Sequence, residues 1–131
     1  MDTPRGIRNN NPGNIRHSAT KWQGQSAVQT DPAFVQFDDP KWGLRAIVKV
    51  LKSYARLGIH TVGGIVARWA PPSENNTRSY TADVCGALGV QPDTPISIDE
   101  KMPQLVKSLV GHEEGQEPYS DELIEEAISL A

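Results

Sequence analysis

The sequence predicts a mainly α-helical fold with a small β patch near the N-terminus. Five segments after residue 38 carry apolar residues at the spacings of three and four that place them on one face of a helix. Residues that begin and end helices flank these segments. Residues 26–30 and 33–37 are β-capable with partial alternation. A chain of 131 residues is long enough to bury one core, so we expect one domain over residues 1–131.

The first of the five helices has the clearest signals. Asp39 is placed to cap it, Pro40 suits its first position, and Gly58 marks its end. Its apolar stripe consists of Leu44, Ile47, Val48, Leu51, Tyr54 and Ala55. We therefore expect a central amphipathic helix.

Four shorter helices are predicted to follow, over residues 61–69, 76–88, 99–114 and from 121 onward. Asn76 is a good cap for the second of these, and Gly89 is its stop. Tyr80 lies on its inward face. Pro103 fits the third only within the first helical turn.

Residues 5–39 are rich in Asn, Gly and Gln, which indicates a structured loop. Four asparagines gather within residues 9–14. Amides pair well with the hydroxyl and acetamido groups of sugars, although at least two of the four are expected to form turns and caps. Trp22 offers an aromatic face for a sugar ring, but a single Trp belongs more often to a core.

Composition excludes several classes of protein. Apolar residues make up 37% of the chain and charged residues 22%, which fits neither a disordered nor a fibrous protein. No apolar run approaches the roughly 18 to 20 residues that cross a bilayer, and the N-terminus does not resemble a secretory signal. Cys85 is the single cysteine, so no intrachain disulfide is possible.

The charges are divided along the chain. Residues 1–78 hold eleven of the thirteen Lys and Arg residues and five acids, whereas residues 79–131 hold two bases and eleven acids. A basic half could meet an anionic polymer such as nucleic acid or the bacterial cell wall. The alternative is that the two halves attract one another within one fold.

Most nucleophile, metal and cofactor sites have no support in the sequence. Cys85 follows Val84 on a predicted helix and is expected to be a small buried hydrophobe. The three histidines lack the spacing of a zinc site. No phosphate-binding or dinucleotide-binding glycine motif is present. We therefore expect no metal and no cofactor, and the candidate catalytic groups are carboxylates.

Glu113 is the most informative carboxylate. Leu105, Val106, Leu109 and Val110 precede it at helical spacing, so its side chain is expected on the face that the core buries. Desolvation raises the pKa of a carboxylate in such a position toward the range of a proton donor. Glu114 is expected nearer the polar side, with Lys107 and Gly111. The alternative is that Glu113 extends past the end of the helix into solvent.

Further carboxylates could serve as a second acid or base. Glu74 lies at the centre of the polar loop 70–77 between two predicted helices, where it is either an active-site acid or a solvated loop residue. Glu122 and Asp39 are candidates for a base that activates water.

Several motifs resemble a set of small bacteriophage and prophage proteins known as virion structural proteins or endolysins. The resemblance covers nearly the whole chain, from Arg5 to about Ala127. The motifs that carry it lie at residues 5–16, 22–24, 34–37, 43–46, 69–77 and 112–119.

A more distant resemblance is to flagellar-type glucosaminidases and lytic transglycosylases of the lysozyme superfamily. Those enzymes place a catalytic Glu at a helix end, followed by an Asn-rich segment, a Trp-x-Gly motif, a Phe-x-x-Tyr segment and a long helix. Residues 10–16, 22–24 and 34–37 and the helix from Pro40 follow that order here. The matching Glu motif, residues 112–115, lies near the C-terminus, which implies a circularly permuted, lysozyme-like domain.

The resemblance implies cleavage of the β-1,4 glycan strand of bacterial peptidoglycan, as a lysozyme, glucosaminidase or lytic transglycosylase. Glu113 would be the general acid, with Glu74 and Glu122 as further catalytic candidates. The residues expected to bind the sugar and its acetamido group are Asn11, Asn14, Trp22 and Tyr80. Without a clear second carboxylate, the substrate's own acetamido or 6-hydroxyl group could assist departure of the leaving group.

The alternative function is a noncatalytic virion or tail component that binds the cell wall. We expect peptidoglycan as the partner, no nucleic acid because the basic residues are scattered singly, no stable membrane insertion, and a monomer. The protein is expected to be made in the host cytoplasm. It would act in the periplasm or cell wall after holin release, virion delivery or dedicated secretion.

Overall fold

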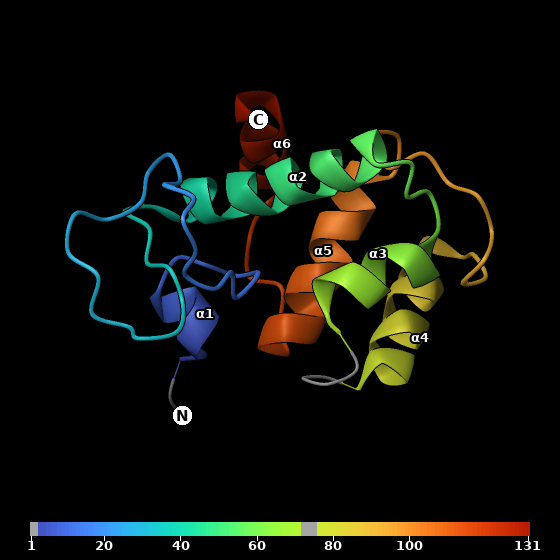
Figure 1. Cartoon of the computed structure of the whole chain (residues 1–131), viewed down its shortest axis with the longest axis horizontal. Helices are drawn as coiled ribbons and strands as arrows, with labels where there is room; N and C mark the ends of the chain where they lie inside the picture. The colour runs from blue at the N-terminus through green and yellow to red at the C-terminus, as the bar shows by residue number, and fades with distance from the viewer. Residues whose placement is uncertain (1–2, 72–75) are drawn as a thin grey trace.

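The computed structural model describes residues 3–71 and 76–131, and it is mainly helical, as predicted. The long helix α2 crosses the molecule with α5 beneath it and α6 behind it (Figure 1). Helices α3 and α4 lie at one end of α2, and α1 lies near the other end (Figure 1). The helices are α1 (Arg5–Arg8), α2 (Pro40–Arg56), α3 (Val62–Trp69), α4 (Thr77–Leu88), α5 (Met102–Glu114) and α6 (Asp121–Leu130).

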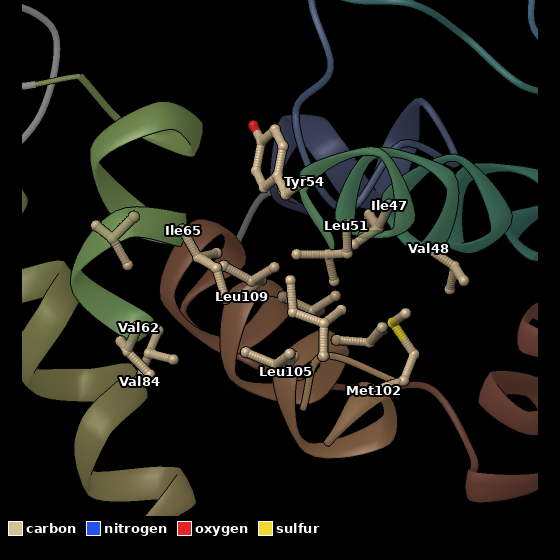
Figure 2. Close-up of a cluster of buried hydrophobic side chains, with 14 of the residues drawn as sticks. Ile47, Val48, Leu51, Tyr54, Val62, Ile65, Val84, Met102, Leu105 and Leu109 are labelled. Atoms are coloured by element: carbon tan, nitrogen blue, oxygen red, sulfur yellow. The ribbon is translucent and has the colours of Figure 1, made fainter. Parts of the chain in front are cut away.

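The main core forms between α2 and α5. Figure 2 shows Leu51 of α2 facing Leu105 and Leu109 of α5, with Ile65 of α3 beside them. All four side chains are inaccessible to solvent. Burying each of them contributes roughly 1.5–3 kcal/mol to folding, so these contacts fix the direction of α5 relative to α2.

The five predicted helices are confirmed, and local side chains explain their ends. Asp39 caps α2 by accepting a hydrogen bond from the Lys41 amide. Asn76 and Ser120 cap α4 and α6 in the same way. Helix α5 begins at Met102, three residues later than predicted, with Pro103 in its first turn.

Helix α1 was not predicted, because residues 5–39 were expected to form a loop. Four residues are too few to show a helical period. A bidentate ion pair holds the helix in place, since the Arg5 guanidinium donates two hydrogen bonds of 2.6 Å to Asp31. The same guanidinium holds the pKa of Asp31 well below its usual range.

The predicted β patch is reduced to two isolated bridges, Arg16 with Phe34 and Gln25 with Phe37. Residues 26–30 do not form the predicted strand. Instead, the Gln29 side chain bonds the backbone of Gln36 through both its amide nitrogen and its carbonyl oxygen, at 2.8 Å each. Side-chain bonds of this kind replace the ladder of a sheet.

The charge division is partly used within the fold. Arg45 and Lys52 of α2 donate hydrogen bonds to the backbone oxygens of Leu130 and Ala131 at the end of α6. Cations are favourable at that end of a helix because its exposed carbonyls carry partial negative charge. Basic α2 and acidic α6 therefore pack together, as the second interpretation of the charge division predicted.

A helix long and apolar enough to cross a bilayer is not found in the described part of the chain.

Two glycines in and after α4 test the helix assignment. Gly86 is exposed within the helix and has open space where a Cβ atom would lie, whereas Gly89 ends the helix with a φ of +69°. We expect Gly86→Ala to raise the free energy of unfolding by about 1 kcal/mol and Gly89→Ala to lower it by about 1 kcal/mol, because only the second forces a side chain into left-handed backbone. Urea denaturation of both variants measures this. Changes of the same sign would contradict the assigned end of α4.

Candidate functional site

The C-terminal end of α5 meets the Asn-rich loop near the N-terminus. The Asn14 side-chain nitrogen donates a hydrogen bond of 3.0 Å to Glu113 Oε1, although the two residues lie 99 positions apart in the sequence. Helix α1 packs against α5 beside this contact. A predicted sugar-binding amide and the predicted catalytic carboxylate are therefore brought together.

The backbone of the loop explains how Asn14 reaches the helix end. Asn10 and Asn14 adopt left-handed φ angles of +53° and +50°. Asn tolerates this conformation better than other residues with side chains. The backbone N–H of Asn14 also donates a hydrogen bond of 3.0 Å to the backbone carbonyl of Asn11, which closes a turn over residues 11–14. The asparagines that predicted turns here therefore also allow the backbone to direct the Asn14 side chain toward α5.

Glu114, not Glu113, is the buried carboxylate. The expected burial of Glu113 and the expected position of Glu114 on the polar side were therefore both wrong. Glu114 is 7% exposed and Glu113 is half-buried. Helix α1 covers Glu114, and Gly6 allows the approach because a Cβ atom there would overlap the Glu114 carboxyl group. The predicted apolar stripe of α5 is confirmed as buried. Helix α1 determines that Glu114 is buried and Glu113 is not, and the sequence of α5 alone does not predict that α1 packs there.

Burial raises the pKa of the Glu114 carboxyl group. Desolvation is the main cause and the charge of Glu113 the second, and together they raise the pKa of Glu114 to about 7. The backbone amides of Ile7 and Gly6 and the side chain of Asn14 oppose this shift. Glu114 Oε2 and Asn14 Oδ1 are both buried and close no hydrogen bond of good geometry with any described residue.

Tyr80 lies close to Glu113 on the core side. It is fully buried, as predicted, so its ring presents no face to a sugar. Its hydroxyl group is directed toward Glu113 and Trp69, and burial followed by the charge of Glu113 raises its pKa. The ring stacks on His112 with 3.8 Å between ring centroids. Tyr80 therefore supports the end of α5 from within the core.

His112 is a member of the site that the sequence did not indicate. Its Nδ1 atom lies 2.6 Å from Asp83 Oδ2 on α4. This contact and the stacking on Tyr80 tie the last turn of α5 to α4. In the sequence, His112 is notable only as the neighbour of Glu113, and this does not predict its contact with Asp83 on α4.

Asn11 has a structural position. Its side chain is fully buried, its Oδ1 atom accepts from the Ile15 amide, and its nitrogen donates to the carbonyls of Ile15 and Val35. These hydrogen bonds hold the loop together. Because the Asn11 side chain is buried and uses its donors and its oxygen within the loop, it is not available to bind a sugar.

Trp22 is a half-buried residue of a packed cluster. It packs with Ile15 and Trp42 against a second apolar cluster that contains Val35 and Phe37. Its indole nitrogen is buried without a hydrogen bond to a described residue. The alternative that Trp22 is a packing residue therefore accounts for its position.

The remaining catalytic candidates are Glu74, Glu122 and Asp39. Glu74 lies outside the described residues. Glu122 is exposed on the first turn of α6, and Asp39 is the cap of α2. Across residues 3–71 and 76–131, no group of three His, Cys, Asp or Glu residues could hold a metal ion. Cys85 is buried on α4, as predicted, and burial raises the pKa of its thiol.

The close approach of Gly6 to Glu114 gives a first test. We expect Gly6→Ala to lower the free energy of unfolding by about 1–3 kcal/mol, because the added methyl group must displace either the Glu114 carboxyl group or α1. Gly111→Ala is the matched control, since it adds a methyl group to α5 where no heavy atom lies within 4 Å. Thermal or urea denaturation compares them, and equal effects would contradict the packing of α1 on Glu114.

The acidity of Glu114 predicts a pH dependence of stability. Its pKa is near 4.5 in the unfolded chain and about 7 in the native protein, so between these values the native state binds the extra proton. The contribution of Glu114 is therefore most favourable below about pH 4.5 and is lost as the pH rises to about 7, by on the order of 3 kcal/mol at most.

Glu114→Gln removes this titration. The free energy of unfolding of wild type minus that of the variant should fall between about pH 4.5 and 7 and then level off. Urea denaturation in a series of buffers measures the difference, and a difference that rises with pH would show that Glu114 is charged when buried.

Comparison with known proteins places the chain in a bacteriophage context. No family model matches it. The chain is 35% identical over 123 residues to Protein P5 of Pseudoalteromonas phage PM2, a match that covers 91% of this chain and 76% of that protein. The relative is a bacteriophage protein, which agrees with the bacteriophage source of the proteins that the sequence motifs resemble. This chain therefore belongs to the same family as Protein P5 of Pseudoalteromonas phage PM2.

Proposed function

We propose that this protein cleaves the β-1,4 glycan strand of bacterial peptidoglycan, with Glu113 as the general acid. The observation that carries the proposal is the hydrogen bond between Asn14 and Glu113. It places a half-buried carboxylate at a helix end beside a loop rich in amides. Carboxylates that protonate a glycosidic oxygen work at partly desolvated positions of this kind.

The neighbouring carboxyl group supports Glu113 as the residue that meets the substrate. Helix α1 covers Glu114, and burial, followed by the charge of Glu113, raises the pKa of Glu114 to about 7. Glu113 is the more exposed member of the pair, so it is the one that contacts the glycosidic oxygen.

The spatial order of the motifs supports a permuted relation to the lysozyme superfamily. In the glucosaminidases and transglycosylases that the sequence resembles, the catalytic Glu precedes the Asn-rich segment. Here Glu113 follows that segment by about a hundred residues, and the hydrogen bond from Asn14 joins the two. A circular permutation of a lysozyme-like domain would require this contact.

The substrate's own groups complete the proposed reaction. Of the described carboxyl groups at this end of α5, Glu114 is covered and Asp83 is paired with His112, which leaves Glu113 to meet the substrate. Attack by the substrate's acetamido or 6-hydroxyl group on the anomeric carbon would then accompany protonation of the leaving oxygen by Glu113. Glu74 is the alternative second group, as the base for a water molecule.

Delivery follows from the proposed substrate. Peptidoglycan lies outside the cytoplasm, and the phage relative supports release with a holin or delivery by a virion. The protein would act as a monomer in the periplasm or cell wall.

The test is cleavage of purified peptidoglycan. We expect zymograms of the wild-type protein to clear, and Glu113→Gln to lower the rate at least ~100-fold with an unchanged or higher thermal midpoint, because the change removes the proton donor and keeps the size of the side chain. Mass analysis of the products identifies the reaction, since anhydromuropeptides indicate a transglycosylase and new reducing ends indicate a hydrolase.

Glu126→Gln is the control, because Glu126 is exposed on α6 and removal of its charge should leave the rate unchanged. Near wild-type rates of Glu113→Gln would reject Glu113 and transfer the assignment to Glu74. No clearing by the wild type, with retained binding to cell walls, would instead favour the noncatalytic wall-binding protein.

A further inference from the structure

A second pocket lies beside helix α1, the helix that covers Glu114. Its volume is about 390 Å³, and its lining consists of Arg5, Arg8, Asn9, Thr30, Asp31, Pro32 and Gln36. Gly6 lies between the two arginines on the same short helix and rests on the Glu114 carboxyl group. The pocket and the carboxyl pair of α5 are therefore joined through one helical turn.

The side chains that line the pocket are held in place by hydrogen bonds to one another. Gln36 accepts from the Thr30 hydroxyl at 3.1 Å and donates to Asn9 at 3.3 Å. Asn9 donates in turn to Asp31 at 3.0 Å, and Asp31 accepts two further hydrogen bonds of 2.6 Å from Arg5. The carboxylate and amide oxygens of the lining are thus already used, and the pocket is preorganised.

Guanidinium groups supply the donors that remain in the pocket. Arg5 uses Nε and Nη2 on Asp31, and its Nη1 group forms no hydrogen bond with a described residue. The exposed Arg8 side chain forms no hydrogen bond or ion pair with any residue in the described ranges. Guanidinium groups pair well with carboxylates and phosphates, often through two parallel N–H groups. The donors of the pocket therefore fit an oxyanion.

The charge around the pocket is positive. The lining holds two guanidinium groups and the carboxylate of Asp31. Arg16 adds a guanidinium group nearby, because Arg5 and Arg16 lie over the same Phe34 ring, 4.7 and 5.0 Å from its centre. Arginines that are scattered singly in the sequence are thus gathered in the tertiary structure, where together they attract anions.

We propose that this pocket binds a carboxylate group of the peptide stems of peptidoglycan, with the Arg8 guanidinium as its main donor. The choice of polymer rests on the proposed function. Helix α1 links the pocket to the carboxyl pair, so a glycan strand held at Glu113 brings its peptide stems toward Arg8. Because the stems carry free carboxylates and the glycan carries none, the pocket makes the protein prefer strands with stems to an uncharged glycan.

A nucleic acid fits the same charges less well. Single-stranded nucleic acids bind along extended rows of cations with aromatic rings open for stacking. Here two guanidinium groups already lie over the Phe34 ring, and Asp31 places a negative charge within the pocket. A single oxyanion at Arg8 is therefore better matched than a chain of phosphates.

Pelleting with purified peptidoglycan tests the pocket. The peptidoglycan is freed of phosphate-containing polymers, and each protein carries Glu113→Gln so that cleavage does not consume the polymer. We expect Arg8→Ala to raise the Kd about tenfold at low salt, because it removes a charge-assisted hydrogen bond. The difference should shrink at high salt, since exposed charges are screened over about 8 Å at physiological ionic strength.

Arg56→Ala is the matched control. It removes the same charge at an exposed position at the end of α2 beside α3, whereas α1 lies near the other end (Figure 1). Arg8→Ala should keep the parent's thermal midpoint, because its side chain has no partner among the described residues. Arg8→Lys keeps the charge without the planar fork and should retain part of the binding. Equal Kd values for Arg8→Ala and Arg56→Ala would overturn the proposal.

A chemically modified wall identifies the anion. Carbodiimide coupling with ammonia converts the carboxylates of the stems into neutral amides. We expect this treatment to weaken binding of the parent protein and to remove the difference between the parent and Arg8→Ala. A difference that survives amidation would overturn the carboxylate as the ligand. Loss of binding to single-stranded DNA in Arg8→Ala, with unchanged binding to peptidoglycan, would overturn the proposal in favour of a nucleic acid.

The two proposals fail in different ways, because pelleting does not require cleavage. If wild type clears no peptidoglycan but binding depends on Arg8 and on the wall carboxylates, the pocket stands and the glycan cleavage is rejected. If wild type clears and binding does not depend on Arg8, the pocket is rejected and the role of Glu113 stands.

Discussion

Burial of the Glu114 carboxyl group beneath α1 is the constraint on which the site depends. Gly6 permits the contact because it has no side chain, and α1 thereby closes over the end of α5. A charged carboxylate in that position would be costly, so its pKa rises to about 7. The cover also leaves Glu113 as the accessible carboxyl group of the pair, beside Asn14.

The packing around α2 places the two sides of the site. Helix α5 is fixed against α2 by buried side chains such as Leu51 and Leu105 (Figure 2). The loop before α2 is anchored separately, because Phe37 and Val35 pack on Ala46 of the same helix. The carboxyl pair and the Asn-rich loop are therefore both anchored to α2. This shared anchor limits their relative movement, although no sheet connects them in the described residues.

Buried polar side chains in the N-terminal region replace a regular ladder. Asp31 bonds Arg5 and Asn9 together with the amides of Ala33 and Phe34. Asn11 plays the same part closer to the site. The abundance of Asn and Gln thus serves the loop first, and Asn14 is the amide directed toward a catalytic candidate. The number of amides in this region therefore did not identify which of them would lie beside Glu113.

The sequence by itself determined the five longer helices, because caps, apolar spacing and stop residues such as Asp39 and Gly89 act within a few residues. It also located the end of α5 as the candidate site. Only the tertiary structure decided that Glu114 is buried and Glu113 accessible, because the covering helix has four residues and no period of its own. Contacts over 99 positions, such as that of Asn14 with Glu113, depend on how the helices pack, which local patterns do not specify.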